Sequence, residues 1–383
     1  MTYCISIDWL ALFCVYSSKC ETPHAPRPFE AAPMCMPRIN AGEQCIGDRY
    51  PWRYKLEPYG TRQFARLYRI AVPNDEGGFD EFAEVQCSPY SNIIDKNAFI
   101  VRFNNRSLYR NDFWDMCELF LNEHDLDFVS VSRIDICADF NQFATYDPRQ
   151  LICDFAAKKL RHVGRGVGAL YFNHGVMSDK QTGYRDYGVL YNGLSFGTHS
   201  SDTRVYLYNK TFELLTQGDK PWIRDMWTAA GLNHDYVWRL EVSIKGKGCK
   251  FKCRQSGKQI TIDTTAAKDT DELATIYHTF VSKLFAFVKN HRGITNISRE
   301  PRITLFDGHL HYQRGVIRNK TGASRTEKIL IKSLYQLADK YRGADIHDLG
   351  ATGKEFAYLL ANSCDLNGWL SEKVNEWEKP IHK

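Results

Sequence analysis

The chain has 383 residues and a formal net charge of +5, with 43% hydrophobic and 25% charged residues. These values are typical of a soluble globular protein, and the length suits about two domains of ~100–200 residues each. Twelve cysteines are scattered too widely for a small secreted disulfide scaffold, and no window reaches the ~20 apolar residues of a membrane span. We therefore expect a cytoplasmic protein with reduced thiols and no membrane partner.

In chain order, the pattern predicts a buried first strand, a Pro- and Cys-rich loop over 20–45, and then alternating strands and helices. Strands are predicted at 64–72, 97–105, 131–140, 168–173, 194–200, 203–210 and 237–245. Helices are predicted at 113–125, 147–160, 271–290, 326–342 and 353–377, the second with Asp147 as its cap and Pro148 in its first turn.

This order predicts an α+β fold with a mostly antiparallel, curved sheet, packed helices and a helical C-terminal region. We assign residues 1–265 to a sheet-based domain and residues 266–383 to a mainly helical region for DNA specificity or partner binding.

Three of the predicted strands have one apolar and one polar face, because successive side chains of a strand alternate. The polar faces carry Arg204, Tyr206, Tyr208 and Lys210 in the first strand, Arg133, Asp135, Cys137 and Asp139 in the second, and Arg239, Glu241, Ser243 and Lys245 in the third. Any one-sided sheet shows such alternation. If the three strands join one sheet, however, these faces merge into a single surface.

That surface would combine three kinds of chemistry. Asp135, Asp139 and Glu241 would offer hard oxygen ligands, which suit Mg²⁺ or Mn²⁺ with substrate phosphate completing the shell. The cations Arg204, Lys210 and Arg239 could hold phosphate charge. A tyrosine could attack phosphorus as a covalent nucleophile.

The same segments resemble the rolling-circle replication initiators of the Rep-trans type, found in plasmids, phages and some conjugative elements. The matching pieces, in the same order, are IDWL at Ile7–Leu10, RIDICAD at Arg133–Asp139, LSFGTHSSDTRVYLYNK at Leu194–Lys210 and WRLE at Trp238–Glu241. They span roughly residues 5–245.

The resemblance implies a metal-dependent DNA nickase and strand transferase that forms a tyrosine–DNA covalent intermediate. The family's tyrosine corresponds to Tyr208, which directly precedes Asn209 and Lys210, and its acids correspond to Asp135, Asp139 and Glu241. The family usually has R-x-Y-x-K, whereas Arg204 lies four residues before Tyr208. Tyr206 shares the same face, so either phenol could be the nucleophile.

The partners implied are single-stranded or supercoiled origin DNA. A host helicase is expected as well, because the chain has no GxxxxGK[ST] phosphate loop. The oligomeric state stays open, a homodimer included. Six basic residues and no acid lie between Val242 and Ile262, which suggests a phosphate-rich partner: Lys245, Lys247, Lys250, Lys252, Arg254 and Lys258.

Three alternatives remain. His309 and His311 would share a face of a strand and, with Tyr335, resemble the metal-binding histidines and tyrosine of HUH nucleases. A non-enzymatic DNA-binding regulator would need neither a metal nor a covalent product, and its tyrosines would stack on single strands. A metal nuclease without a covalent step would need the acids but not the phenol.

Overall fold

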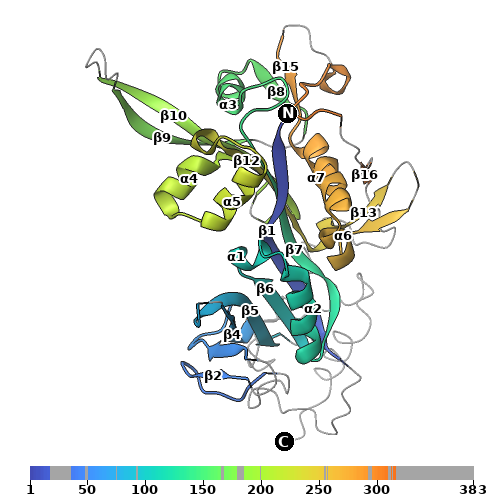
Figure 1. The fold of residues 1–383 in the computed structure, drawn as a ribbon. Helices are drawn as coiled ribbons and strands as arrows, with labels where there is room; N and C mark the ends of the chain where they lie inside the picture. The colour runs from blue at the N-terminus through green and yellow to red at the C-terminus, as the bar shows by residue number, and fades with distance from the viewer. Residues whose placement is uncertain are drawn as a thin grey trace, which may run out of the picture. The chain divides into compact units, whose positions relative to one another are not determined.

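The computed structural model describes residues 1–17, 36–47, 51–74, 76–91, 94–164, 168–178, 185–198, 200–253, 256, 258–291, 296–308, 312 and 314–315. The chain divides into two compact units, Met1–Ile317 and Arg318–Lys383, and all the described residues belong to the first. Residues 266–317 are thus part of the same compact unit as the strands that precede them. Figure 1 shows this unit as a ribbon.

Eleven strands of the described residues form one large sheet. They are β1 (Tyr3–Tyr16), β2 (Gln44–Ile46), β3 (Arg53–Leu56), β4 (Phe64–Pro73), β5 (Phe79–Pro89), β6 (Ala98–Phe103), β7 (Leu126–Phe140), β9 (Ala169–Ser178), β10 (Arg185–Phe196), β11 (Thr203–Asn209) and β12 (Trp238–Lys245). Their order is β2-β3-β4-β5-β6-β1-β7-β12-β11-β10-β9, with every neighbouring pair antiparallel. The long strands β1 and β7 therefore lie at the centre, beside β12 and β11.

Two small sheets complete the strands that are described. In one, β8 (Leu160–His162) pairs with β15 (Phe287–Lys289). In the other, β13 (Lys250–Cys253) lies between β14 (Gln259–Thr261) and β16 (Arg314–Gly315).

Seven α-helices and three 3₁₀ turns occur within the described residues. The α-helices are α1 (Asn105–Leu108), α2 (Phe113–Glu123), α3 (Pro148–Ala156), α4 (Lys210–Gln217), α5 (Pro221–Ala229), α6 (Thr264–Lys268) and α7 (Thr270–Leu284). The 3₁₀ turns are η1 (His234–Tyr236), η2 (Gly246–Cys249) and η3 (Ile297–Arg299). None of these helices is long and apolar enough to cross a membrane.

The apolar face of the central strands is covered by α7. Ile136 of β7 and Leu240 of β12 are fully buried, as are Ile276 and Tyr277 of α7, and all four belong to one hydrophobic core. The Tyr277 hydroxyl donates a hydrogen bond of 3.0 Å to the Leu240 carbonyl. Burial of this face fixes which side chains point the other way, because a strand that slips by one residue exchanges its two faces.

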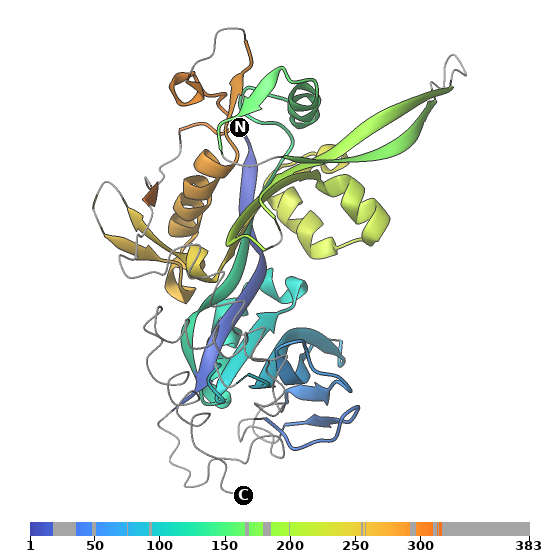
Figure 2. The same ribbon diagram turned by 180° about the vertical axis from the view of Figure 1, so that it is seen from behind.

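The helices α4 and α5 lie on the opposite side of these strands from α7, as the two views show (Figures 1 and 2). Their apolar residues form a second, smaller hydrophobic cluster, which includes Leu214, Ile223 and Trp227. The polar face of β7 and β12 is therefore partly enclosed by a helical layer of its own.

The predicted fold class is confirmed: helices pack on a large antiparallel sheet. The predicted helix at 147–160 is present as α3, and its cap, Asp147, accepts a hydrogen bond of 2.8 Å from the Gln150 amide. The helix predicted at 271–290 ends earlier, at Leu284, because Phe287 and its neighbours pair with β8 as a strand. The helices predicted at 326–342 and 353–377 lie outside the described residues.

Candidate functional site

The polar faces of β11, β12 and β7 merge into one surface, as the sequence predicted for strands of one sheet, and β1 adds a fourth strand to it. Residues that pair directly across antiparallel strands point to the same face. Three such rows cross the four strands: Tyr208–Arg239–Asp139–Cys4, Tyr206–Glu241–Cys137–Ser6 and Arg204–Ser243–Asp135–Trp9. Asp135 and Glu241 are diagonal neighbours in this register, and the Cα atoms of such neighbours lie ~7–8 Å apart, with their Cβ atoms somewhat closer.

A bulge in β1 adds an acid to this surface. The register between β1 and β7 shifts between Ile7 and Trp9, so Asp8 is an extra residue, and such bulges redirect side chains. The Asp8 carboxylate accepts hydrogen bonds from Asn105 Nδ2 (3.1 Å) and the Tyr109 hydroxyl (3.4 Å), and it pairs with Arg239. Asp8 was not among the predicted site residues, although an acid within an apolar strand is a signal that the sequence does contain.

Arg239 and Asp139 form a buried ion pair. Arg239 Nε donates to Asp139 Oδ1 (2.6 Å) and Nη2 donates to Oδ2 (2.7 Å), while Trp227 Nε1 from α5 donates to the same Oδ2 (2.7 Å). Both charged side chains are 0% exposed. The phosphate contact predicted for Arg239 and the metal ligation predicted for Asp139 do not fit this arrangement, because each group is already held by its buried partners.

Tyr208 lies in a cleft of about 520 Å³ whose lining also includes Asp8, Tyr171, Tyr206 and Glu241. Its hydroxyl donates a hydrogen bond of 3.2 Å to Glu241 Oε2. The Tyr206 ring stacks on the Tyr208 ring, with centroids 4.6 Å apart and planes at 25°, and lies 5.1 Å from the Tyr171 ring. Tyr208 thus contacts a carboxylate, whereas Tyr206 contacts other rings.

Lys210 is not on the strand face where the sequence placed it. The Asn209 side chain accepts a hydrogen bond of 2.8 Å from the Phe212 amide and caps α4, so Lys210 is the first residue of that helix. Its ammonium lies 2.5 Å from Glu213 Oε2 and 5.4 Å from the centre of the Tyr208 ring, and its side chain is 1% exposed. Lys210 is therefore close to Tyr208, but it is neutralised by Glu213.

Arg204 lies at the Tyr206 side of the cleft. Its Nη2 donates a hydrogen bond of 3.0 Å to the Tyr171 hydroxyl, and its guanidinium carbon is 5.6 Å from the centre of the Tyr206 ring. Arg204 is half-buried. Arg204 therefore contacts two of the aromatic side chains that line the cleft, Tyr171 and Tyr206.

The carboxylates of the site perturb one another. Burial, followed by the charges of Asp8 and Asp135, raises the pKa of Glu241 to about 8. Burial also raises the pKa of Asp135, against the opposing effect of Arg133. Burial alone would raise the pKa of Asp8 too, but Arg239, Lys210 and Lys220 lower it to about 2. Burial and the neighbouring carboxylates therefore both oppose the ionisation of Glu241.

The burial of Tyr208 works against its ionisation. Burial raises the pKa of the Tyr208 phenol well above its usual value, and the charge of Glu241 raises it further. Burial likewise raises the pKa of Tyr206, to about 12. Either phenol would need a proton acceptor and added positive charge in order to act as a nucleophile.

The predicted ligand set of Asp135, Asp139 and Glu241 does not form a ready-made metal site. Asp139 is held by Arg239, and Asp135 accepts hydrogen bonds from Arg133 Nε (3.0 Å) and Nη2 (2.5 Å). No group of three His, Cys, Asp or Glu side chains among the described residues is arranged to hold a metal ion. Asp8 and Glu241 do line the cleft together, and one or two carboxylates with substrate phosphate are the usual protein ligands of Mg²⁺.

Most of the predicted DNA-binding lysines are accessible. Lys250 and Lys252 are exposed on one face of β13, whereas the alternate residues Phe251 and Cys253 are buried. Lys247 and Lys258 are also exposed and Lys245 is half-buried, but Arg254 lies outside the described residues. His309, His311 and Tyr335, the residues of the alternative site, lie outside them too.

No protein-family model and no curated protein sequence matches the chain. Among solved structures, it is similar to the rolling circle replication initiator protein from Geobacillus stearothermophilus. The two share 14% identity with a TM-score of 0.39, over 79% of this chain and 92% of that chain. Likeness at this level is too low to transfer site residues from that protein to this one.

Proposed function

We propose that the protein is a rolling-circle replication initiator that nicks and rejoins single-stranded origin DNA through Tyr208. The observation that carries this proposal is the hydrogen bond from the Tyr208 hydroxyl to Glu241 in a cleft that Asp8 also lines. A phenol, a proton acceptor and a further carboxylate are the groups that such chemistry requires at one point.

In the proposed reaction, Tyr208 Oη attacks the scissile phosphorus and gives its proton to Glu241. A bond forms between the tyrosine oxygen and phosphorus while the bond from phosphorus to the 3′ oxygen breaks, and the departing oxygen takes a proton from water to become a 3′-hydroxyl. The covalent bond keeps the energy of the broken phosphodiester, and rejoining by the reverse attack needs no ATP.

A Mg²⁺ or Mn²⁺ ion held by Asp8 and Glu241 would neutralise charge on the scissile phosphate when bound. The raised pKa of Glu241 fits such a cation, because an added positive charge would relieve the repulsion among the carboxylates. Asp135 would contribute its charge without direct ligation.

Other residues would position these groups. Arg239 is held by Asp139, which also accepts a hydrogen bond from Trp227, and Arg239 pairs with Asp8 and fixes the carboxylate on the bulge. Tyr206 packs on Tyr208 and limits the rotation of its ring, while Arg204 would contact the flanking DNA backbone. The lysines of β13 would hold more distant phosphates, and a host helicase would supply the unwinding.

The test is a nicking assay on supercoiled origin DNA with and without Mg²⁺. We expect wild-type protein and Tyr206→Phe to convert supercoiled to open-circular DNA when the ion is present, and Tyr208→Phe not to. Phe keeps the ring stacking and removes only the hydroxyl, so the two variants are matched. Binding without strand breakage by the wild-type protein would favour the DNA-binding regulator instead.

A further inference from the structure

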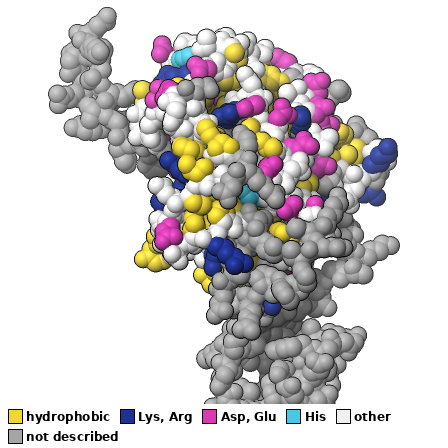
Figure 3. Space-filling model, turned by 60° about the horizontal axis from the view of Figure 1, so that its bottom comes forward, with side chains coloured by type: hydrophobic (Ala, Val, Ile, Leu, Met, Phe, Trp, Pro, Cys, Tyr) yellow, Lys and Arg dark blue, Asp and Glu magenta, His cyan; other side chains and the backbone are white. Residues whose placement is uncertain are grey.

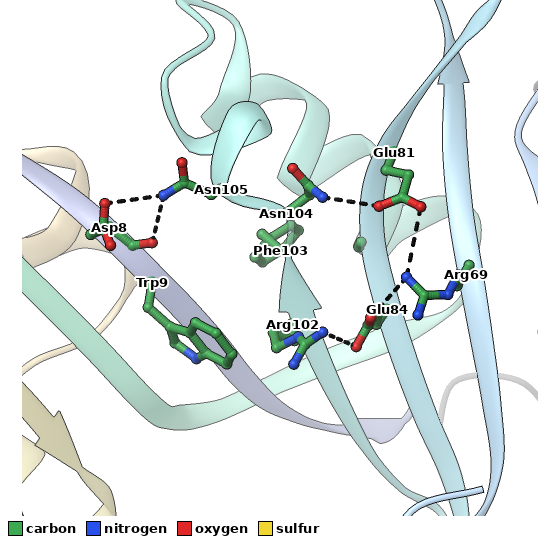
Figure 4. A pocket seen from close by; sticks show the side chains of 10 residues that line it. Asp8, Trp9, Arg69, Glu81, Glu84, Arg102, Phe103, Asn104 and Asn105 are labelled. Carbon is green, nitrogen blue, oxygen red and sulfur yellow. Dashed lines mark hydrogen bonds and ion pairs between the residues drawn. The ribbon is translucent and has the colours of Figure 1, made fainter. Parts of the chain in front are cut away.

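A second cavity lies on the other side of Asp8. It has a volume of about 200 Å³, and its walls come from β1, β6, β5, β4 and the start of α1 (Figure 4). Asp8 lines both this cavity and the cleft of Tyr208. We call it the Trp9 pocket. A nucleotide whose phosphate lies beside Asp8 would have its sugar and base within reach of this pocket.

One wall of the Trp9 pocket is made of planar groups. The guanidinium carbon of Arg102 lies 4.8 Å from the centre of the Trp9 ring, and that of Arg133, which does not line the pocket, lies 4.4 Å from it. The indole N–H is buried and has no hydrogen-bond partner in the described part of the chain. Trp9 and Arg102 thus offer planar surfaces in the pocket on which a base can stack.

The remaining walls are rich in hydrogen-bonding groups of both kinds. Asn104 Nδ2 donates to Glu81 (3.1 Å), Asn105 Nδ2 donates to Asp8, and Glu84 pairs with both Arg69 and Arg102. Figure 4 shows a series of interactions from Asn104 through Glu81, Arg69 and Glu84 to Arg102, and separately the contact between Asp8 and Asn105. The face in Figure 3 likewise has interspersed acidic and basic side chains over its described residues.

This balance of charge selects against a bare phosphate and in favour of a neutral ligand. A phosphate in the pocket would meet the carboxylates of Asp8, Glu81 and Glu84, whereas a nucleobase offers uncharged donors and acceptors on its edges. The volume is below the ~300–1,000 Å³ of pockets that bury drug-sized ligands, so it suits a single ring system and excludes a duplex.

We propose that the Trp9 pocket binds one unpaired base of the DNA strand that is cut, next to the scissile phosphate. This proposal rests on the proposed function and adds a base-reading site to it. Enzymes that act on DNA commonly take a base out of the stack and read its edge between planar side chains. Trp9 and Arg102 would stack on the base, and Asn104 would read its edge.

The test uses Tyr208→Phe protein, which cannot form the covalent product, and a pool of random single-stranded oligonucleotides. Sequencing of the bound oligonucleotides should show a biased position. Removing the base at that position with an abasic nucleotide should weaken binding about tenfold, and so should Trp9→Ala, since stacking of a base on an aromatic ring is worth about that factor. Combined, the two changes should cost no more than either one alone.

Arg110→Gln is the matched control, because Arg110 pairs with Asp112 outside the pocket. Because Arg110 does not contact the base, any fold-change in affinity caused by Arg110→Gln should multiply with the fold-change caused by the abasic nucleotide. Asn104→Ala keeps the stacking wall, and it should relax the base preference even if Trp9→Ala fails to fold. An unbiased pool would overturn the pocket assignment, as would effects of Trp9→Ala and the abasic nucleotide that multiply.

The two proposals fail in distinguishable ways. Wild-type protein that forms no covalent adduct with the pool, while the Trp9 and abasic effects remain coupled, would contradict nicking but support the pocket. An adduct that forms at Tyr208 without this coupling would support nicking and overturn the pocket.

Discussion

Glu241 has to lose a proton before it can accept one from Tyr208. Its pKa is raised to about 8, so the ionised fraction increases as the pH rises through that value. At limiting metal, we therefore expect the rate of covalent adduct formation to increase with pH with a midpoint near 8. Glu241→Gln should lower the rate by about 10²–10⁴-fold, as expected for loss of a general base, and remove this dependence.

The raised pKa of Glu241 can also be checked through the pH dependence of the protein's stability. A carboxyl whose pKa is higher in the folded protein than the usual glutamate value of 4.5 keeps a proton that the unfolded chain has lost. The free energy of unfolding therefore falls as the pH rises from 4.5 to about 8. Glu241→Gln should therefore raise the melting temperature more at pH 8 than at pH 5. An inactive variant with no such gain would indicate that Glu241 is not in the repulsive environment described here.

Asp139 should stabilise the fold through its buried ion pair with Arg239, and this contribution can be measured without an activity assay. Asp139→Asn would leave the buried Arg239 guanidinium with less compensating charge, and breaking a buried ion pair costs about 3–5 kcal/mol. Urea denaturation measures this loss. The control is Asp219→Asn, which breaks the solvent-exposed pair with Arg224 and should lower the free energy of unfolding far less. Equal losses would argue against a buried pair.

At the level of secondary-structure elements, the close approach of β10 to β11 determines where Tyr206 packs. A Cβ atom on Gly193 would lie 2.8 Å from Tyr206 Cε2 and 2.9 Å from the Leu207 carbonyl oxygen. Gly193→Ala should destabilise the protein by about 1–3 kcal/mol, as overpacking does, and slow adduct formation by displacing the ring that packs on Tyr208. Adding Tyr206→Leu should recover part of the stability. A variant with wild-type activity would contradict the role given to this stack.

The exposed lysines of β13 predict how DNA binding depends on salt. Each phosphate contact to single-stranded DNA contributes ~0.7 to the slope of log affinity against log salt, so Lys250→Gln with Lys252→Gln should reduce the slope by about 1.4. Lys268→Gln is the control. It removes one positive charge from an exposed lysine on α6, outside the basic segment Lys245–Lys258, and so shows how much the loss of charge alone changes the slope. Titrations at several salt concentrations measure the slope. An unchanged slope would mean that β13 makes no phosphate contact.

On the scale of the whole molecule, the sequence predicted the surface better than the roles of its residues. Alternation placed Tyr208, Glu241 and Asp135 each on the polar face of its own strand, because an apolar face has to be buried. That the three strands join one sheet was only a condition of the prediction, and the structure meets it. The bulge at Asp8 is a single interruption of the strand, so the alternation of polar and apolar residues does not reveal it. The burial of Asp139 depends on Trp227, 88 residues away, which the alternation of β7 does not reveal.

Lys210 shows a similar limit over a shorter range. The alternation of polar and apolar residues in Thr203–Lys210 continues as far as Lys210. The strand nevertheless ends at Asn209, because the Asn209 side chain caps the helix that begins at Lys210. Asn at that position is itself a helix-start signal, so this boundary could have been found. The pairing of Lys210 with Glu213 then follows from helical spacing.

The central claim is that Tyr208 becomes covalently joined to DNA. The most direct measurement is to incubate the protein with single-stranded oligonucleotides and Mg²⁺, separate the adduct on a denaturing gel and sequence the DNA-linked peptide. Trypsin would release Val205–Lys210 with both tyrosines, so Tyr206→Phe and Tyr208→Phe have to be run in parallel. We expect a DNA-linked Tyr208 that persists in Tyr206→Phe and is lost in Tyr208→Phe. An adduct that survives Tyr208→Phe, or that maps to Tyr206 or Tyr335, would show that Tyr208 is not the nucleophile.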